Sequence, residues 1–323
     1  MKIIRYTPDR IVEDPPEALP DIMARPEGAV WVDMTGPSED DVRAMRDIFH
    51  FHPLAVEDTM KQAQRPKLEE YEGYFFMTLH AMRPPGQQRQ PVGLQEVDLF
   101  FTARYVVTVH PHPVAALDEA RARLTKASSA LRTHTDFLLY TIVDAAVDTY
   151  FPVIDRIDQA LDRTEDQIFK RPSQQALDQL FTLKRSLLQM RRVAAPLRDI
   201  FNSLTRRDLA LVRHETLVYF RDVYDHLLRI TDMIDTHRDL LTGAVEIYLS
   251  SISNRLNEVM KVLTVITAIF APLAVITGFY GMNFERTFPP FEWTYGIVPV
   301  IIVMVAVVAG MLYVFGRRGW LSR

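Results

Sequence analysis

The stretch that decides the fold runs from Asn257 to Phe284 and reads NEVMKVLTVITAIFAPLAVITGFYGMNF. Within it, Val262 to Tyr280 carries no charged side chain. A helix rises about 1.5 Å per residue, so a run of this length roughly matches the hydrocarbon thickness of a bilayer, about 30 Å. The stretch predicts a transmembrane helix that continues from a polar helix and ends at Gly281-Met282-Asn283.

A second apolar segment, Ile297 to Phe315, is followed by a short tail that holds Arg317 and Arg318. Short arginine-rich segments stay on the cytoplasmic side of a membrane, so we expect the C-terminus inside. The link between the two spans carries Glu285 and Glu292 together with several aromatic residues, which suits the outer surface. The sequence therefore predicts a multi-pass protein with both termini in the cytoplasm.

Composition limits the possible partners and binding sites. The chain has 323 residues, of which 24% are charged, and its net charge of -4 gives no reason to expect nucleic acid as a partner. With no cysteine, it has neither disulfides nor a zinc-thiolate site. The N-terminus lacks an apolar run long enough for a signal peptide, so we expect the soluble part to remain in the cytoplasm.

The first 110 or so residues have the composition of a small mixed α/β sheet. Short runs of β-branched and aromatic residues predict strands at Lys2 to Tyr6, Ala29 to Met34, Tyr74 to His80, Gln95 to Phe101 and Tyr105 to His110. Two helices are predicted between them, one from Pro37 toward Phe49 and one from Leu54 to Gln62.

Helical periodicity replaces this pattern from Val114 onward. Apolar residues at threes and fours predict one helix from Thr135 to Phe169, which Pro152 only bends, and a second from Gln174 to about Ser203. From about Asp208 to Tyr280 a single helix of about 70 residues is possible. A helix that long needs partners, and copies of the same chain are the ones we expect.

The first span has one face of small or weakly polar residues that recur at fours and threes. They are Met260, Thr264, Thr267, Ala271, Ala274 and Gly278. Such a face can simply let helices pack closely. It ends, however, at Asn283, whose amide offers both a carbonyl acceptor and N–H donors at the membrane surface. A ring of these amides would suit a hard cation that keeps its water.

These residues carry a family resemblance. Tyr280-Gly281-Met282-Asn283-Phe284 between two C-terminal spans resembles the signature of the CorA family of magnesium transport proteins. The similarity extends over nearly the whole chain and includes His52-Pro53-Leu54, Glu57-Asp58, Gln64-Arg65-Pro66-Lys67, Tyr140 to Tyr150, Tyr219 to His226 and Asn254 to Leu263.

The resemblance implies a homopentameric channel in the cell inner membrane that carries Mg2+, and also Co2+ and Ni2+. Each chain would contribute an α+β cytoplasmic domain of the αβα funnel type, a long stalk helix and two C-terminal transmembrane helices. The expected division is 1–207 for the αβα domain with its helical hairpin, 208–261 for the stalk, 262–280 for the pore-lining span, 281–296 for the external loop, 297–315 for the second span and 316–323 for the basic tail.

The resemblance also implies roles for individual residues. Asn283 matches the asparagine that binds hydrated Mg2+ at the pore mouth, and Gly281 and Met282 hold its turn. The inner pore and gate correspond to Asn257, Met260 and Leu263, and Thr264, Thr267, Ala271 and Ala274 continue the same lining. Ala271 and Ala274 depart from the methionine and threonine that are frequent there. Asp58 and Asp222 match carboxylates that bind regulatory Mg2+ between neighbouring subunits.

Membrane potential can drive such transport, because a divalent ion that crosses 100 mV gains about 4.6 kcal/mol, twice the roughly 2.3 kcal/mol of a single charge. The sequence has no phosphate-binding glycine loop, and we expect neither enzymatic activity nor an organic cofactor. Two alternatives remain open. One is a zinc transporter of the same superfamily, and the other is a sensor or enzyme that the two spans only anchor.

Several of these residues also have structural interpretations. Asp58 can be a helix cap or a surface acid, and Asp222 a solvated acid. Another set of acids is predicted to form a solvated helix face: Asp144, Asp148, Asp155, Asp158, Asp162, Glu165 and Asp166. Two pairs of histidines, His50 with His52 and His110 with His112, are expected to be satisfied turn or surface residues rather than metal ligands.

Overall fold

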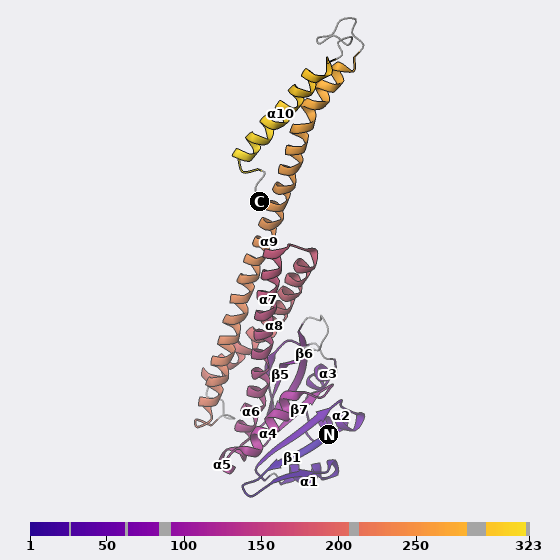
Figure 1. Ribbon diagram of the computed structural model, residues 1–323. Helices are drawn as coiled ribbons and strands as arrows, with labels where there is room; N and C mark the ends of the chain where they lie inside the picture. Colours follow the sequence, from indigo (N-terminus) through magenta and orange to yellow (C-terminus); the bar gives the residue numbers. More distant parts are fainter. Residues whose placement is uncertain (26, 62–63, 84–91, 207–212, 283–294, 321–323) are drawn as a thin grey trace. The chain divides into compact units, whose positions relative to one another are not determined.

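The computed structural model of the chain describes residues 1–323 apart from 26, 62–63, 84–91, 207–212, 283–294 and 321–323. It divides into two compact units, Met1–Val245 and Glu246–Arg323. The longest helix, α9 (Leu217–Tyr280), contributes residues to both units. Figure 1 labels the elements by which each unit is described below.

A mixed sheet of seven strands forms the base of the first unit. The strands are β1 (Lys2–Tyr6), β2 (Ile11–Asp14), β3 (Ala29–Thr35), β4 (Lys67–Tyr71), β5 (Tyr74–Arg83), β6 (Gly93–Phe101) and β7 (Tyr105–His110). Their order is β2-β1-β3-β7-β6-β5-β4, and β3 with β7 is the parallel pair while the other neighbours are antiparallel. The strands β3, β5, β6 and β7 are largely buried because helices cover both of their faces.

One face of the sheet packs against α1 (Leu19–Ala24), α2 (Glu39–Asp47) and α3 (Pro53–Lys61). Alternate residues of the strands, such as Val32, Phe76 and Phe100, form a continuous apolar core with Met45 and Val56 of these helices. The start of α2 is fixed by a capping box, in which the Ser38 hydroxyl accepts from the Asp41 amide and the Asp41 carboxylate accepts from the Ser38 amide.

The opposite face is covered by longer helices. These are α4 (Ala115–Lys126), α6 (Thr135–Asp148), α7 (Tyr150–Lys170) and α8 (Gln174–Arg206). Two short elements complete the unit: α5 (Ser129–Arg132) precedes α6, and the 3-10 helix η1 (Pro16–Ala18) precedes α1 on the other face. α7 and α8 pack side by side as a helical hairpin, as Figure 1 shows. The first unit therefore has three layers, αβα, and the fold class implied by the resemblance is confirmed.

The structure corrects several predicted elements. The helix predicted from Thr135 to Phe169 is interrupted at Thr149, where α6 ends and α7 begins. Pro152 has no N–H to donate to the carbonyl of Asp148, and this missing bond accounts for the break. The edge strands β2 and β4 were not predicted, because each is short and rich in charged residues. The predicted start of the long helix at Asp208 is also wrong, since residues 213–216 form a turn before α9.

A buried ion pair holds this turn to the start of α6. Asp136 is 6% exposed, and its carboxylate accepts hydrogen bonds from the Arg213 guanidinium at 2.9 and 3.0 Å and from the Thr216 hydroxyl. Burial by itself would raise the pKa of Asp136, but the hydrogen bonds from Arg213 and Thr216 outweigh it and lower the pKa. The chain just before α9 is thereby fixed to the α/β layer.

Two apolar helices dominate the second unit. They are the C-terminal part of α9 and α10 (Ile297–Arg317), and both are long and apolar enough to cross a membrane. In the most apolar 18-residue segment of each helix, only 6% of α9 and 0% of α10 is buried. The α6–α7 segment, Thr135–Lys170, has a comparable window, but 72% of it is buried in the first unit, so its apolar residues belong to a protein core.

We expect Asp136→Asn to reduce the free energy of unfolding of the first unit by about 1–3 kcal/mol at neutral pH, because Arg213 loses a charged partner. The pKa of Asp136 is lowered on folding, so its contribution is present above the unfolded value of about 3.9 and is lost as the pH falls through the lower folded pKa. The difference from wild type should therefore shrink below about pH 4. Thermal unfolding of the full chain in detergent, followed by circular dichroism, measures it.

Asp155→Asn is the matched control, since Asp155 is an exposed acid on α7. Equal stability of the Asp136→Asn and Asp155→Asn variants at neutral pH would contradict the proposed contribution of Asp136.

Candidate functional site

The predicted pore residues share one face of α9. All seven of them are exposed: Asn257, Met260, Leu263, Thr264, Thr267, Ala271 and Ala274. A different set, Val265, Ile269, Leu273 and Ile276, is partly covered. The described residues of the second unit thus leave the predicted pore face uncovered and shield part of the rest of the span.

The hydroxyl of Thr264 on this face donates to the Met260 carbonyl of its own helix at 2.7 Å. Its oxygen retains a free lone pair, so it can still accept a hydrogen bond from a water molecule. Ala271 and Ala274 present only methyl groups. Among the predicted pore residues within the span, the hydroxyls therefore lie in its N-terminal half, at Thr264 and Thr267.

α9 ends at the predicted signature. The amide of Gly281 donates to the Thr277 carbonyl at 2.9 Å, and the amide of Met282 donates to the Phe279 carbonyl at 3.2 Å. A Cβ at Gly281 would lie 3.2 Å from the Thr277 oxygen, so a larger residue would crowd this last turn. Asn283, the predicted selectivity residue, lies outside the described residues.

Basic and aromatic side chains gather at the other end of the two helices. The Lys261 ammonium donates to the Gly319 carbonyl at 3.0 Å and lies 6.0 Å from the centre of the Trp320 ring. Trp320 stacks on Phe315, and the Arg317 guanidinium lies over Tyr313. Aromatic and basic residues are typical of a membrane interface on the cytoplasmic side. These contacts tie the residues after α10 to α9.

The two predicted regulatory acids, Asp58 and Asp222, lie in different surroundings. Asp58, on α3, accepts from the Lys67 ammonium at 2.6 Å, and Lys67 also contacts Glu69. Asp222, on α9, is half exposed and has His226 at 3.9 Å. The structure gives them separate partners within one chain, and their predicted meeting across subunits remains a prediction.

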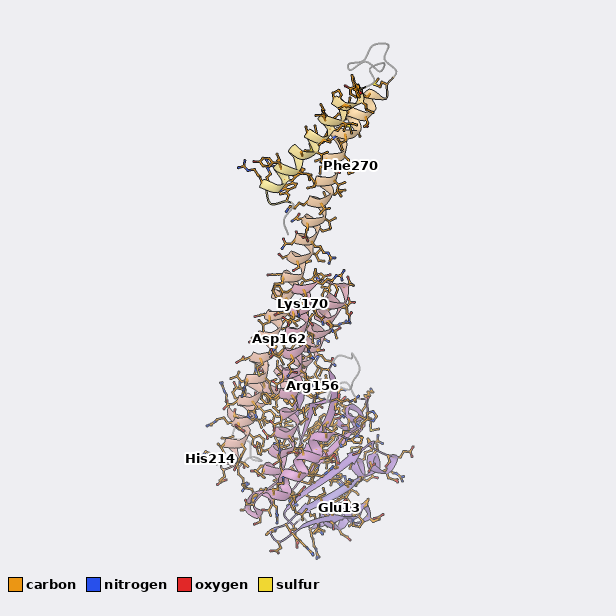
Figure 2. The ribbon with its side chains drawn as sticks, viewed as in Figure 1. Glu13, Arg156, Asp162, Lys170, His214 and Phe270 are labelled. Carbon is orange, nitrogen blue, oxygen red and sulfur yellow. The ribbon has the colours of Figure 1, made fainter. Side chains whose placement is uncertain are left out.

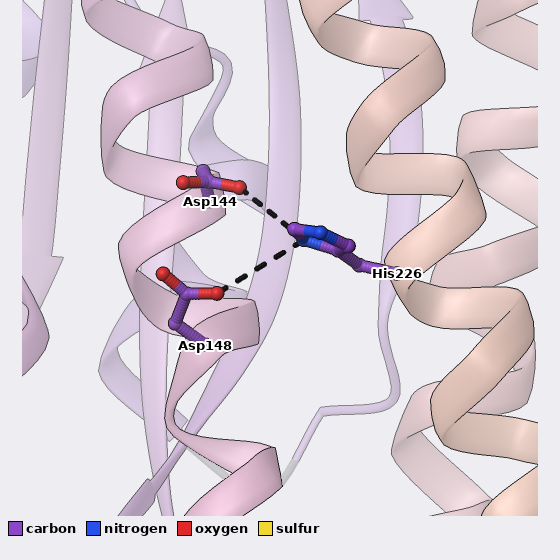
Figure 3. Close-up of side chains that lie close together, drawn as sticks. All are labelled: Asp144, Asp148 and His226. Carbon is purple, nitrogen blue, oxygen red and sulfur yellow. Dashed lines mark ion pairs between the residues drawn. The ribbon is translucent and has the colours of Figure 1, made fainter.

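A third group, which the sequence did not single out, combines two acids of α6 with a histidine of α9. Figure 3 shows the His226 ring between Asp144 and Asp148, with Nδ1 at 3.7 Å from an Asp144 oxygen and 4.0 Å from an Asp148 oxygen. Arg123 of α4 also binds both carboxylates, each at 2.8 Å. Asp222 extends this group through its contact with His226.

Asp144 is only 6% exposed, so its assignment to a solvated helix face is wrong. Burial, together with repulsion from Asp148, raises the pKa of Asp144. The other acids of that set include Asp155, Asp158, Asp162 and Asp166, which are exposed as predicted. The signal for the buried group was present in the sequence as an i, i+4 pair of aspartates, but the partner histidine is too distant in the chain for periodicity to reveal it.

The predicted histidine pairs behave as satisfied residues where their contacts are described. His110 is buried, with Nε2 at 2.9 Å from an Asp33 oxygen and Nδ1 at 2.6 Å from the His112 carbonyl. His52 accepts from the Leu54 amide through Nδ1 at 3.2 Å.

Comparison with known proteins agrees with this architecture. Residues 26–318 match the family model described as CorA-like Mg2+ transporter protein. The cobalt/magnesium transport protein CorA of Thermotoga maritima is 38% identical over 293 residues, which cover 90% of this chain and 83% of that protein. An αβα unit joined to two apolar helices, together with these matches, defines a membrane transport protein for divalent cations. The chain belongs to the CorA-like Mg2+ transporter family.

Solved structures agree on the fold. The complete structure of the CorA magnesium transporter from Methanocaldococcus jannaschii is similar with a TM-score of 0.83 at 23% identity, covering 99% of this chain and 98% of that one. The ZntB cytoplasmic domain from Vibrio parahaemolyticus is similar over 79% of this chain with a TM-score of 0.63 at 11% identity. At such identities the likeness concerns the fold alone.

Proposed function

We propose that this protein carries Mg2+, and also Co2+ and Ni2+, across the plasma membrane through a pore that five copies of the chain form around a central axis. The observation that carries this proposal is the uncovered face of α9, where Asn257, Met260, Thr264, Thr267 and Ala271 all lie exposed. An apolar span with a uniform, small-residue face needs other helices against it. Copies of the same helix supply them.

Selection takes place at Asn283, held by the turn of Gly281 and Met282. Mg2+ releases its water reluctantly and is usually bound through few protein oxygens with several waters retained. A ring of neutral amides can therefore hold the hydrated ion, whereas carboxylates would bind it too tightly to release it. Membrane potential drives entry, and neither ATP nor an organic cofactor takes part.

The inner end of the pore holds the gate. Met260 and Leu263 are exposed apolar residues one turn apart, and rings of such side chains close a pore by excluding water. Asn257 supplies amides just inside them. Ala271 and Ala274 leave a wider, less polar passage between this gate and the outer ring of Asn283.

Internal Mg2+ closes the pore by binding between subunits at Asp58 and Asp222. These carboxylates repel each other across the interface until a cation bridges them, so a high internal Mg2+ concentration stabilises the closed arrangement. The partly buried group of Asp144, Asp148 and His226 lies beside Asp222 on α9, and Arg123 offsets part of its negative charge.

Lys261, Arg317 and Trp320 mark the cytoplasmic boundary of the membrane, so both termini lie inside. The proposed segments are an αβα domain to 207, a stalk to 261 whose helix begins at Leu217, spans at 262–280 and 297–315, an external loop at 281–296 and a basic tail from 316. The protein acts as a transporter and has no enzymatic reaction.

Asn283→Ala should abolish Mg2+ uptake into proteoliposomes while the pentamer still assembles, because the variant removes the amide ring and leaves the sequence of both spans unchanged. Uptake is followed with a Mg2+-sensitive dye, and assembly by the mass of the detergent complex. Unchanged Mg2+ flux would favour a chain whose spans only anchor it. Wild-type uptake of Zn2+ without Mg2+ would instead identify a zinc transporter.

The double variant Asp58→Ala, Asp222→Ala should stay open at internal Mg2+ concentrations that close the wild type. We expect the half-inhibiting concentration in patch-clamp recordings to rise at least about tenfold, the loss equivalent to about 1.4 kcal/mol of binding free energy. Inhibition at the wild-type concentration would exclude these two acids as the sensor.

Lys67→Met should have the opposite effect. The Lys67 ammonium forms an ion pair with the Asp58 carboxylate, so Mg2+ has to displace it in order to bind there. The pair is partly buried, since 26% of the Lys67 side chain and 31% of the Asp58 side chain are accessible. Its removal should lower the half-inhibiting Mg2+ concentration about two- to fivefold, as for a pair worth up to about 1 kcal/mol. The Lys67 ammonium also lies 5.1 Å from the centre of the Phe76 ring, and the thioether of methionine can contact an aromatic ring in its place.

The control is Lys61→Met. Lys61 forms an ion pair with Glu57 on the same helix, and among the described residues it forms no hydrogen bond with Asp58. A higher half-inhibiting concentration in Lys67→Met, or an equal decrease in Lys61→Met, would contradict competition at Asp58.

A further inference from the structure

A histidine and a glutamate face each other inside the first unit, away from the acids discussed above. His80 of β5 is paired directly with Glu96 of β6 in the antiparallel register. Both side chains are buried, with 6% and 9% of their surfaces accessible. They alternate in step with Phe76 and Phe100, so they point to the face of the sheet that α3 covers.

Among the described residues, each of the two side chains has one buried polar atom without a hydrogen-bond partner. These atoms are His80 Nδ1 and Glu96 Oε1. A buried polar atom without a partner costs about 1–3 kcal/mol. Two such atoms on facing residues indicate ordered water beside the pair.

The spacing between the two side chains favours a metal ion. His80 Nε2 lies 3.5 Å from Glu96 Oε2, longer than the usual N–H···O hydrogen bond of about 2.9–3.0 Å. A tetrahedral ion bound by an imidazole nitrogen and a carboxylate oxygen, each at about 2.0–2.2 Å, holds these atoms about 3.4 Å apart. Nε2 and Oε2 are therefore spaced as two ligands of one ion, which leaves Nδ1 and Oε1 to form hydrogen bonds with water.

Surrounding residues provide space and orientation. A cavity of about 390 Å3 is bordered by His80, Glu96, Gln95 and His112, and a second of about 210 Å3 adjoins Glu96 from the side of Asp98. The liquid volume of one water is about 30 Å3, so an ion can keep water in its remaining positions. Arg83 also borders the larger cavity, but it is exposed, so solvent screens its charge.

The carboxylate of Glu96 is held in place from outside the cavity. The amide of Gln64 donates to Glu96 Oε2 at 2.9 Å. Hydrogen bonds of this kind orient a ligating carboxylate and are a regular part of metal sites.

We propose that His80 and Glu96 bind a tetrahedral transition-metal cation, Zn2+ or Co2+, with water completing its coordination. An imidazole ligand discriminates against Mg2+, which prefers oxygen ligands in octahedral geometry. The site is independent of ion movement through the membrane. It gives the soluble unit a binding site for borderline cations that is distinct from the carboxylate sites for Mg2+.

The experiment titrates Co2+ into the full-length protein in detergent, in a large excess of Mg2+, and records visible absorption. Tetrahedral Co2+ absorbs much more strongly than hydrated octahedral Co2+, so the spectrum reports this site and not hydrated ions in a pore. We expect one equivalent per chain in the wild type, and at least about a tenfold loss of Co2+ affinity in His80→Gln and in Glu96→Gln.

His214→Gln is the matched control, because it also removes one imidazole but from the exposed turn before α9, labelled in Figure 2. It should retain the wild-type spectrum. Circular dichroism of each variant verifies that the sheet is folded.

An unchanged tetrahedral spectrum in a folded His80→Gln variant, or loss of the wild-type spectrum in excess Mg2+, would overturn the assignment. A wild-type protein with no tetrahedral spectrum would show that water alone fills the cavity. Because Mg2+ uptake is not measured, failure of the transport proposal leaves this test intact, and the reverse also holds.

Discussion

The second unit depends on one constraint, the need to cover the apolar surface of α9 and α10. Large side chains such as Phe270, Val275 and Ile302 are more than half exposed. Contiguous apolar surface on this scale is not stable in water. Lipid can cover the outward-facing side chains, but the face of small residues offers lipid little contact and suits close helix packing. The same requirement therefore accounts for both the membrane and the assembly of several chains.

Much of the fold could be predicted from the sequence, because local patterns reflect local causes. β1 and β7 have the predicted bounds, since their β-branched residues lie in buried strands. β2 and β4 were missed, because an edge strand needs few apolar residues and gains its order from one neighbour. The break at Thr149 was missed for a related reason, since the apolar periodicity continues across it and only the backbone is interrupted.

The candidate functional residues also fall into two groups, those that a local sequence pattern identifies and those that it does not. The predicted pore residues lie on one helix. Spacing placed Met260, Thr264, Thr267, Ala271 and Ala274 on a common face, the family resemblance added Asn257 and Leu263, and the structure leaves all seven exposed. Asp144 and His226 come from helices that are distant in the chain, and only the packing of α9 against α6 brings them together. His80 and Glu96 likewise meet through strand register, which a single sequence does not specify. Local periodicity therefore finds a surface, whereas tertiary structure is needed to find a cluster.

The pore face has a further geometric consequence. Asn257, Thr264 and Ala271 are spaced by seven residues, and so are Met260, Thr267 and Ala274. A straight α-helix drifts about 20° for every seven residues, so a strict seven-residue repeat cannot stay on one side of it. Helices that meet through this face must wind around one another in a left-handed coil. In the proposed pore, the width of the passage is therefore linked to the degree of winding of its helices.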